Sequence, residues 1–161
     1  MFDLPYRKTV KLRHNLDVTH IEKNICDNVI GTLLSVDGKN KDTDKARLDL
    51  EDMIIRKELH LKRHSNVSFE KPPALFTLSV KEREGFCDFL KSIKYLDGYA
   101  ANISNCVTAQ AGKLSGLKSH DSHVLKQRLL PIGMCGYLNK EIGTTLFELG
   151  NFFKQLCSKT L

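Results

Sequence analysis

An aspartate and a histidine stand three residues apart near the start of the chain, as Asp17 and His20. If the segment is helical, this spacing places both side chains on the same side of one turn. A carboxylate and an imidazole so placed can hydrogen-bond each other, bind a metal, or hold a neighbouring acidic site in position. The simpler alternative is that Asp17 caps the helix, because aspartate is a favoured N-cap residue, and that His20 is an ordinary first-turn residue.

Cationic side chains are densest between residues 56 and 64. The cluster consists of Arg56, Lys57, His60, Lys62, Arg63 and His64. It can contact the phosphates of a nucleic acid, or it can be a solvated helix end, where cations suit the helix dipole. No aromatic residue lies among these side chains to stack on bases, which favours the helix end. His60 and His64 have the spacing of metal ligands, but no third ligand lies close to them in the sequence.

Two isolated carboxylates are further candidates. Glu22 falls in the first turn of the predicted helix that follows Asp17, where we expect an exposed carboxylate that pairs with the helix dipole. Glu148 lies between apolar residues of the last predicted helix. For Glu148 we expect the flank of the core rather than a catalytic position, because acidic residues are seldom fully buried.

A second polar group comprises His120, Asp121 and His123. It lies at the predicted start of a helix, where a polar first turn is the simpler interpretation. The alternative is a cluster that faces Asp17 and His20 across a cleft. The spacing of the residues leaves both interpretations open.

Apolar periodicity and capping residues predict five helices that must position these side chains. Their approximate ranges are 18–34, 43–53 (beginning at Asp42 or Thr43), 79–95, 119–130 and 140–158. Ser79 with Glu82 forms a capping box, and Pro131 is expected to stop the fourth helix. Residues 54–61 either continue the second helix or break and restart it. One doubtful strand at 9–16 completes the prediction of a mostly α fold with at most one or two short strands.

Composition and length limit the class of protein. The chain has 161 residues, of which 41% are hydrophobic and 27% charged, enough for one globular domain with a core. A net charge of +6 favours polyanionic partners. The five cysteines are odd in number and widely spread, which indicates a reducing compartment rather than a disulfide framework. No signal peptide or transmembrane segment is visible, so no membrane association is expected.

Six segments together resemble plant CACTA (En/Spm-type) transposases. They are 12–24 (LRHNLDVTHIEKN), 31–34 (GTLL), 46–50 (ARLDL), 116–125 (GLKSHDSHVL), 129–131 (LLP) and 150–153 (GNFF). The resemblance covers nearly the whole chain, in order. Departures from the family pattern are Arg7 in place of tryptophan, Thr19 in place of methionine, and Cys135 in place of a basic residue.

This resemblance implies an RNase H-like DDE/D enzyme in which acidic residues bind two Mg²⁺ ions for phosphodiester transfer. Asp17 and His20 are similar to the Asp-x-x-His element that supports the active site in several such families. The resemblance places the first two catalytic aspartates before Met1, and makes Glu148 or Glu141 a candidate for the last acidic residue. It also implies transposon-end DNA as a partner and a nuclear location.

We therefore expect a single transposase-derived fragment, from the C-terminal part of the catalytic region and its helical insertion. Its expected parts are a core-like element (1–35), an insertion-like segment (36–136) and a C-terminal amphipathic helix (137–161). It should lack catalysis alone and bind no cofactor alone. Its expected partners are DNA, the remainder of a transposase, or a transposon-encoded accessory protein. The alternatives are a DNA- or protein-binding helical module that uses Arg56, Lys57, Lys62 and Arg63, and an inert remnant without a stable fold.

Overall fold

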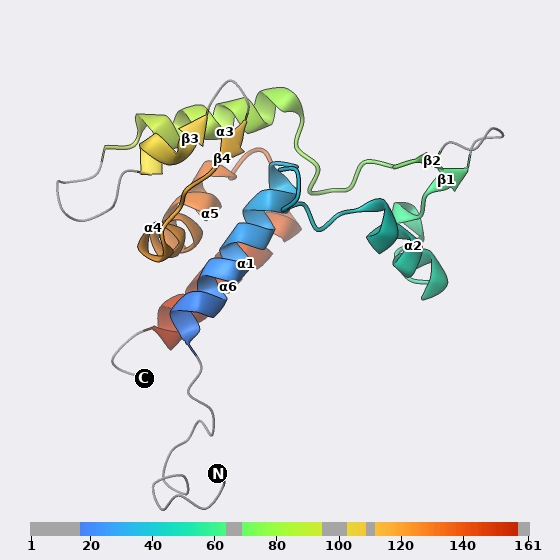
Figure 1. Ribbon diagram of the computed structural model, residues 1–161, viewed down its shortest axis with the longest axis horizontal. Helices are drawn as coiled ribbons and strands as arrows, with labels where there is room; N and C mark the ends of the chain where they lie inside the picture. Colours follow the sequence, from blue (N-terminus) through green and yellow to red (C-terminus); the bar gives the residue numbers. More distant parts are fainter. Residues whose placement is uncertain (1–16, 64–68, 95–102, 109–111, 158–161) are drawn as a thin grey trace, which may run out of the picture.

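The computed structural model describes residues 17–63, 69–94, 103–108 and 112–157, and it is mostly helical (Figure 1). The predicted mostly α fold class is therefore confirmed. All five predicted helices are present in these ranges. The doubtful strand at 9–16 lies outside the described residues.

Capping residues fix where the helices begin. Helix α2 (Asp44–Asp52) begins after Thr43, whose hydroxyl accepts a hydrogen bond from the backbone N–H of Ala46 at 3.2 Å. Helix α3 (Val80–Ser92) begins with the predicted capping box, in which Ser79 and Glu82 each accept from the other's backbone N–H. Asn139 caps helix α6 (Lys140–Leu156) with a single hydrogen bond, in which its Oδ1 accepts from the backbone N–H of Glu141 at 2.9 Å. The helix starts were thus predictable from local sequence.

The fourth helix differs from its prediction in two ways. Its first part, α4 (Ser119–Val124), begins after Lys118 rather than Ser119, because Asp121 accepts from the backbone N–H of Lys118 at 3.0 Å. The rod then continues through a π-helical segment, η5 (Leu125–Leu129), into α5 (Leu130–Gly133). The prediction that Pro131 stops this helix is wrong. The wider π turn shifts the hydrogen-bond register, so Pro131 falls in the first turn of α5, where a missing donor is tolerated.

Short hairpins occupy segments that were predicted to be connectors or helix. Strand β1 (Lys62–Arg63) pairs antiparallel with β2 (Phe69–Glu70), and β3 (Val107–Thr108) with β4 (Lys113–Leu114). Two 3₁₀ helices precede them, η2 (Lys57–Leu59) and η3 (Ile103–Cys106). The second predicted helix breaks at Met53, because Ile54 and Arg56 adopt positive φ angles of 58° and 49°.

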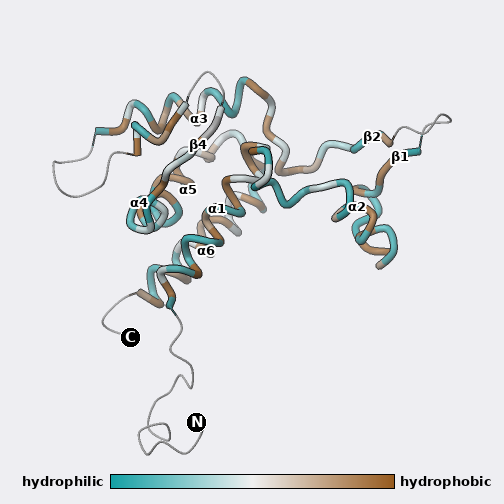
Figure 2. The backbone as a smooth tube through the Cα atoms, viewed as in Figure 1, coloured by the Kyte–Doolittle hydropathy of each residue, from teal (hydrophilic) through white to brown (hydrophobic). Residues whose placement is uncertain are grey.

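The chain divides visibly into a bundle and an arm (Figure 1). The bundle contains α1 (Val18–Leu33), α3, α6 and the α4–η5–α5 rod, which packs against α1 and α6. The arm contains α2, η2, β1 and β2 and extends to one side. Apolar residues alternate with polar ones along the bundle helices (Figure 2), and the apolar ones form the core. Core residues include Cys26, Ile30, Leu34, Phe86, Leu90, Leu125, Leu130 and Met134.

The three predicted parts of the chain do not form separate bodies in the bundle. Helix α1 comes from the core-like element, α4 from the insertion-like segment and α6 from the C-terminal helix, and α4–η5 contacts both of the others. The boundaries at residues 35 and 136 stay predictions.

Gly133 allows α5 to approach α3 closely. A Cβ atom at this position would lie 2.5 Å from Cε1 of Phe89 and 2.7 Å from Cε2 of Phe86. We expect Gly133→Ala to lower the free energy of unfolding by about 1–3 kcal/mol, because the added methyl overpacks the core. Chemical denaturation followed by circular dichroism measures this change, and a cooperative transition would also exclude the inert remnant.

Gly143 is the matched control, because a Cβ atom there has nothing within 4 Å. It lies inside α6, where alanine is a better helix former than glycine. Gly143→Ala should therefore raise the free energy of unfolding by about 0.5–1 kcal/mol. Equal destabilisation by both substitutions would contradict the close approach at Gly133.

Candidate functional site

Asp17 and His20 are connected through a backbone hydrogen bond. Oδ1 of Asp17 accepts from the backbone N–H of His20 at 3.0 Å, and both side chains are exposed. This is the N-cap geometry of the simpler alternative, which is therefore confirmed. A supporting role in catalysis stays a prediction from the resemblance.

The predicted DNA-contacting residues all lie on the arm and are exposed. Arg56 and Lys57 are at η2, and Lys62 and Arg63 form β1. Nη2 of Arg63 lies 3.6 Å from Oε1 of Glu51 across the arm. This segment is a 3₁₀ turn followed by a strand, so the interpretation as a helix end is wrong. His64, the last member of the cluster, lies outside the described residues.

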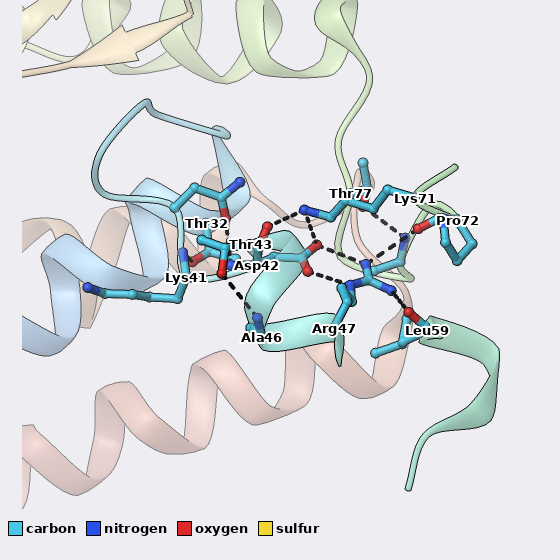
Figure 3. A network of polar contacts seen from close by, with 12 residues as sticks. Thr32, Lys41, Asp42, Thr43, Ala46, Arg47, Leu59, Lys71, Pro72 and Thr77 are labelled. Atoms are coloured by element: carbon cyan, nitrogen blue, oxygen red, sulfur yellow. Dashed lines mark hydrogen bonds and ion pairs between the residues drawn. The ribbon is translucent and has the colours of Figure 1, made fainter. Parts of the chain in front are cut away.

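A buried guanidinium holds the arm together (Figure 3). Arg47 is 1% exposed and forms a two-point contact with Asp42, with Nε to Oδ1 at 2.5 Å and Nη2 to Oδ2 at 2.8 Å. Its Nη1 also donates to the carbonyl oxygen of Leu59 at 2.7 Å, and Nη2 to that of Pro72 at 3.4 Å. Lys71 completes the network by donating to the backbone carbonyl of Asp42.

This network fixes the segment that carries the exposed cations. Leu59 ends η2 and Pro72 follows β2, so both flanks of the β1–β2 hairpin are tied to Arg47. The hydrogen bonds from Arg47, and the charge of Lys71, hold the pKa of Asp42 below its ordinary value against the effect of burial. Asp42 therefore stays ionised, and the arm has a charged anchor at neutral pH.

The second charged centre lies in the bundle, at Glu22. This residue is 1% exposed, so the prediction of an exposed carboxylate is wrong. The face of α1 that packs on the bundle contains Glu22, Cys26 and Ile30, at i, i+4 and i+8, whereas Ile21 is 37% exposed. The apolar residues that recur every four positions are Ile21, Ile25, Val29 and Leu33. Leu33 is buried as this pattern indicates, but the buried stripe before it is rotated by one residue.

The two oxygens of Glu22 have different partners. Oε1 accepts from Nε2 of Gln127 at 3.0 Å and lies 3.3 Å from Nζ of Lys126. Oε2 lies 2.7 Å from Nδ1 of His123 and 3.9 Å from Sγ of Cys157. These partners come from the continuous α4–η5 segment and from the C-cap of α6, so one carboxylate on α1 joins two elements that are far from it in the sequence.

Lys126 is 1% exposed and is stabilised from two sides. Its ammonium pairs with Glu22 and lies 3.0 Å from the centroid of the Phe153 ring, a cation–π contact. Burial lowers the pKa of Lys126, while the charge of Glu22 opposes that shift. Burial alone would raise the pKa of Glu22, but hydrogen bonds from His123 and Gln127 and the charge of Lys126 hold it below 4.5. We conclude that Glu22 and Lys126 form a buried ion pair.

Glu22, His123 and Cys157 are the group of three metal-ligand side chains that the described residues bring together. Their ligand atoms all lie within 4.8 Å of one another. His123 therefore faces Glu22 rather than the Asp17–His20 pair, and Asp121 serves as the cap of α4. Asp121 and His123 thus have partners other than Asp17 and His20, and a cleft between the two groups stays a prediction.

Glu148 is exposed on α6 rather than at the flank of the core. All five cysteines are free, as the sequence predicted. Lys126, Gln127 and Cys157 were not predicted as parts of a site. The spacing of Glu22, Cys26 and Ile30 could have indicated this site. The three residues share one helical face, and a carboxylate on a buried face is expected to have a charged or hydrogen-bonding partner.

Comparisons with known protein families, with curated proteins and with solved structures found no match to this chain. Among the described helices, none has the length and apolar composition needed to cross a membrane.

Removing the charge of Glu22 should destabilise the bundle strongly. Glu22→Gln keeps the shape of the side chain but leaves Lys126 buried without its counter-ion. We expect the free energy of unfolding to fall by about 3–5 kcal/mol at neutral pH. Glu148→Gln, an exposed glutamate on α6, is the matched control and should change it by less than about 0.5 kcal/mol.

The same comparison has a defined pH dependence. Because the pKa of Glu22 is lowered on folding, its ionisation stabilises the protein above the unfolded-state value near 4.5, and this stability is lost as the pH falls through the folded-state pKa. The difference between wild type and Glu22→Gln should therefore be full at neutral pH and shrink below about pH 4.5. A difference that does not change with pH would contradict an ionised Glu22.

Proposed function

We propose that this chain is part of a plant CACTA-type transposase, from the end of an RNase H-like catalytic region and its helical insertion. In this proposal the chain is not catalytic alone and binds DNA through the exposed cations of the arm. Sequence segments along nearly the whole chain support the family, and the mostly helical fold agrees with a helical insertion. A transposase acts on chromosomal DNA, so the proposed location is nuclear.

The proposal of DNA binding rests on the exposure of the cations of the arm. Arg56, Lys57, Lys62 and Arg63 are all exposed within one short stretch, and the Arg47 network anchors the backbone on both sides of β1–β2. Anchored cations bind phosphates at a smaller entropic cost than cations on a free loop. A phosphate-contacting face is the use that best fits this arrangement.

The distribution of carboxylates supports the absence of catalysis by the chain alone. A two-metal site needs several carboxylates that converge on two Mg²⁺ ions. Asp17 is engaged as a helix cap, Glu22 is paired with Lys126, and Glu148 is exposed on a different helix. In the proposed full enzyme, Asp17 and His20 support the active site and Glu148 is a candidate for its last acidic residue. The remaining ligands, and with them the Mg²⁺ ions, would come with the rest of the transposase.

Exposed apolar side chains on α6 support the proposal that this chain belongs to a larger assembly. Phe147, Phe152 and Leu156 are 56%, 53% and 47% exposed. Phe152 and Leu156 are four residues apart and share one face of α6, whereas Phe147 lies on the opposite side. Neighbouring exposed apolar groups such as Phe152 and Leu156 are typical of a contact face. The remainder of the transposase, or a transposon-encoded accessory protein, is the proposed occupant.

Salt-dependent DNA binding tests the role of the arm. The affinity for a short duplex with transposon-end sequence, measured by fluorescence anisotropy, should fall as salt is raised, because phosphate contacts release counter-ions. Lys62→Ala combined with Arg63→Ala should weaken binding and reduce the salt slope by about 2.

The control removes the same charge from another surface. Lys140→Ala with Lys154→Ala takes two exposed cations from α6. This variant should keep most of the affinity and of the salt slope. Equal losses in the two double variants would indicate attraction by net charge alone, and binding without a salt slope would contradict phosphate contact altogether.

Incubation with transposon-end DNA and Mg²⁺ tests the absence of catalysis. We expect no cleavage by the chain alone, measured by gel electrophoresis of end-labelled DNA. Metal-dependent nicking that Asp17→Ala abolishes would contradict this expectation. Asp17→Ser is then the informative control, because serine keeps the helix cap but removes the carboxylate.

A further inference from the structure

We propose that Glu22, His123 and Cys157 form a binding site for a divalent transition metal of the zinc class. The site lies where α1, α4 and the end of α6 meet. This inference is independent of the proposed transposase function, because it uses neither the arm nor the Asp17–His20 pair.

The proposal rests on the different partners of the two carboxylate oxygens of Glu22. Oε2 faces the two other ligand atoms, with Nδ1 of His123 at 2.7 Å and Sγ of Cys157 at 3.9 Å. Oε1 is held by Gln127 at 3.0 Å and by Lys126 at 3.3 Å. A metal on Oε2 would therefore leave the contacts of Oε1 in place. Nε2 of Gln127 also lies 3.1 Å from Nδ1 of His123, and a metal on Nδ1 would replace that second contact. Gln127 and Lys126 would orient the carboxylate, as outer partners of metal ligands commonly do.

The distances are close to those of a metal site. Tetrahedral Zn²⁺ holds nitrogen and oxygen ligands at about 2.0–2.2 Å and sulfur at about 2.3 Å, so neighbouring ligand atoms stand about 3.3–3.8 Å apart. The Sγ–Oε2 distance of 3.9 Å nearly meets this requirement. The Nδ1–Oε2 distance of 2.7 Å has to widen by about 0.6 Å. His123 is half-buried, so a small rotation of its ring can provide that change.

The donor set selects the metal. One nitrogen, one oxygen and one sulfur suit Zn²⁺ or Co²⁺, and a thiol disfavours Mg²⁺ and Ca²⁺, which prefer oxygen. Three protein ligands leave a fourth position for water or another small ligand. Cys157 is exposed, so a metal ion can reach the site from solvent.

Metal binding must displace protons. Burial and the charge of Glu22 raise the pKa of Cys157, while Lys126 acts in the opposite direction, so the thiol is protonated at neutral pH. On binding, Cys157 loses its thiol proton to solvent, because the thiolate is the form that ligates a metal. One proton then leaves for each ion bound, so affinity should rise about tenfold for each unit of pH below the thiol pKa.

Titration of the full chain with Co²⁺ tests the site. We expect a thiolate-to-cobalt charge-transfer absorption that saturates at one ion per chain and disappears when Zn²⁺ is added. Cys157→Ser should abolish this absorption. Cys135→Ser is the matched control, because Cys135 is also exposed but lies in the turn between α5 and α6, and it should keep the absorption unchanged.

A second variant distinguishes the loss of a metal ligand from misfolding. His123→Gln removes the imidazole ligand, and it should weaken Co²⁺ binding at least tenfold while circular dichroism shows the helices retained. The absence of a thiolate-to-cobalt absorption in the wild-type chain would overturn the proposal. Absorption that survives Cys157→Ser, or that is lost equally in Cys135→Ser, would overturn it as well.

Discussion

The Glu22 carboxylate has to stay ionised where almost no water reaches it, and the bundle is arranged to make that possible. An unpaired carboxylate in such a place would be protonated or would unfold the protein. Here four side chains surround it: His123, Lys126, Gln127 and Cys157. Because they come from α4, η5 and the end of α6, satisfying one charge fixes the rotation of α1 and the positions of the other two elements.

The arm also contains a buried charged side chain, Arg47, and its counter-ion is close in the sequence. Arg47 finds its carboxylate, Asp42, five residues away, whereas Glu22 and His123 are 101 residues apart. A short closure costs less chain entropy than a long one, so the Asp42–Arg47 contact can form before the bundle is complete. The two charged centres share no residue. A change on the arm surface is therefore expected to leave the Glu22 network intact, and the arm can be altered without loss of the bundle.

The same difference explains what the sequence could predict. Caps such as Ser79 and Asn139 depend on residues within one turn, and all the helix starts lie at or next to the predicted residue. The prediction that the fourth helix ends at Pro131 was wrong because a π turn before this residue changes the hydrogen-bond register. No local sequence pattern predicts that turn. Glu22 was assigned to solvent because it was expected in the first turn, where a carboxylate can pair with the helix dipole. It lies beyond that turn, on the buried face of α1 that also contains Cys26 and Ile30.

For the candidate sites, the exposure of the arm cations could be predicted, but that of Glu22 and Glu148 and the meeting of Glu22 with Cys157 could not. The arm cations come as two pairs, 56–57 and 62–63, and charged side chains are mostly exposed, so their place at the surface follows from composition. Glu22 and Cys157 meet only because η5 keeps the α4–η5–α5 rod in place against both α1 and α6, across 135 residues of sequence. Asp17 and His20 are near each other by sequence alone, and a cap accounts for that spacing fully. A chemical role for the Asp17–His20 pair stays a prediction from the resemblance, whereas the Glu22 group already holds its partners.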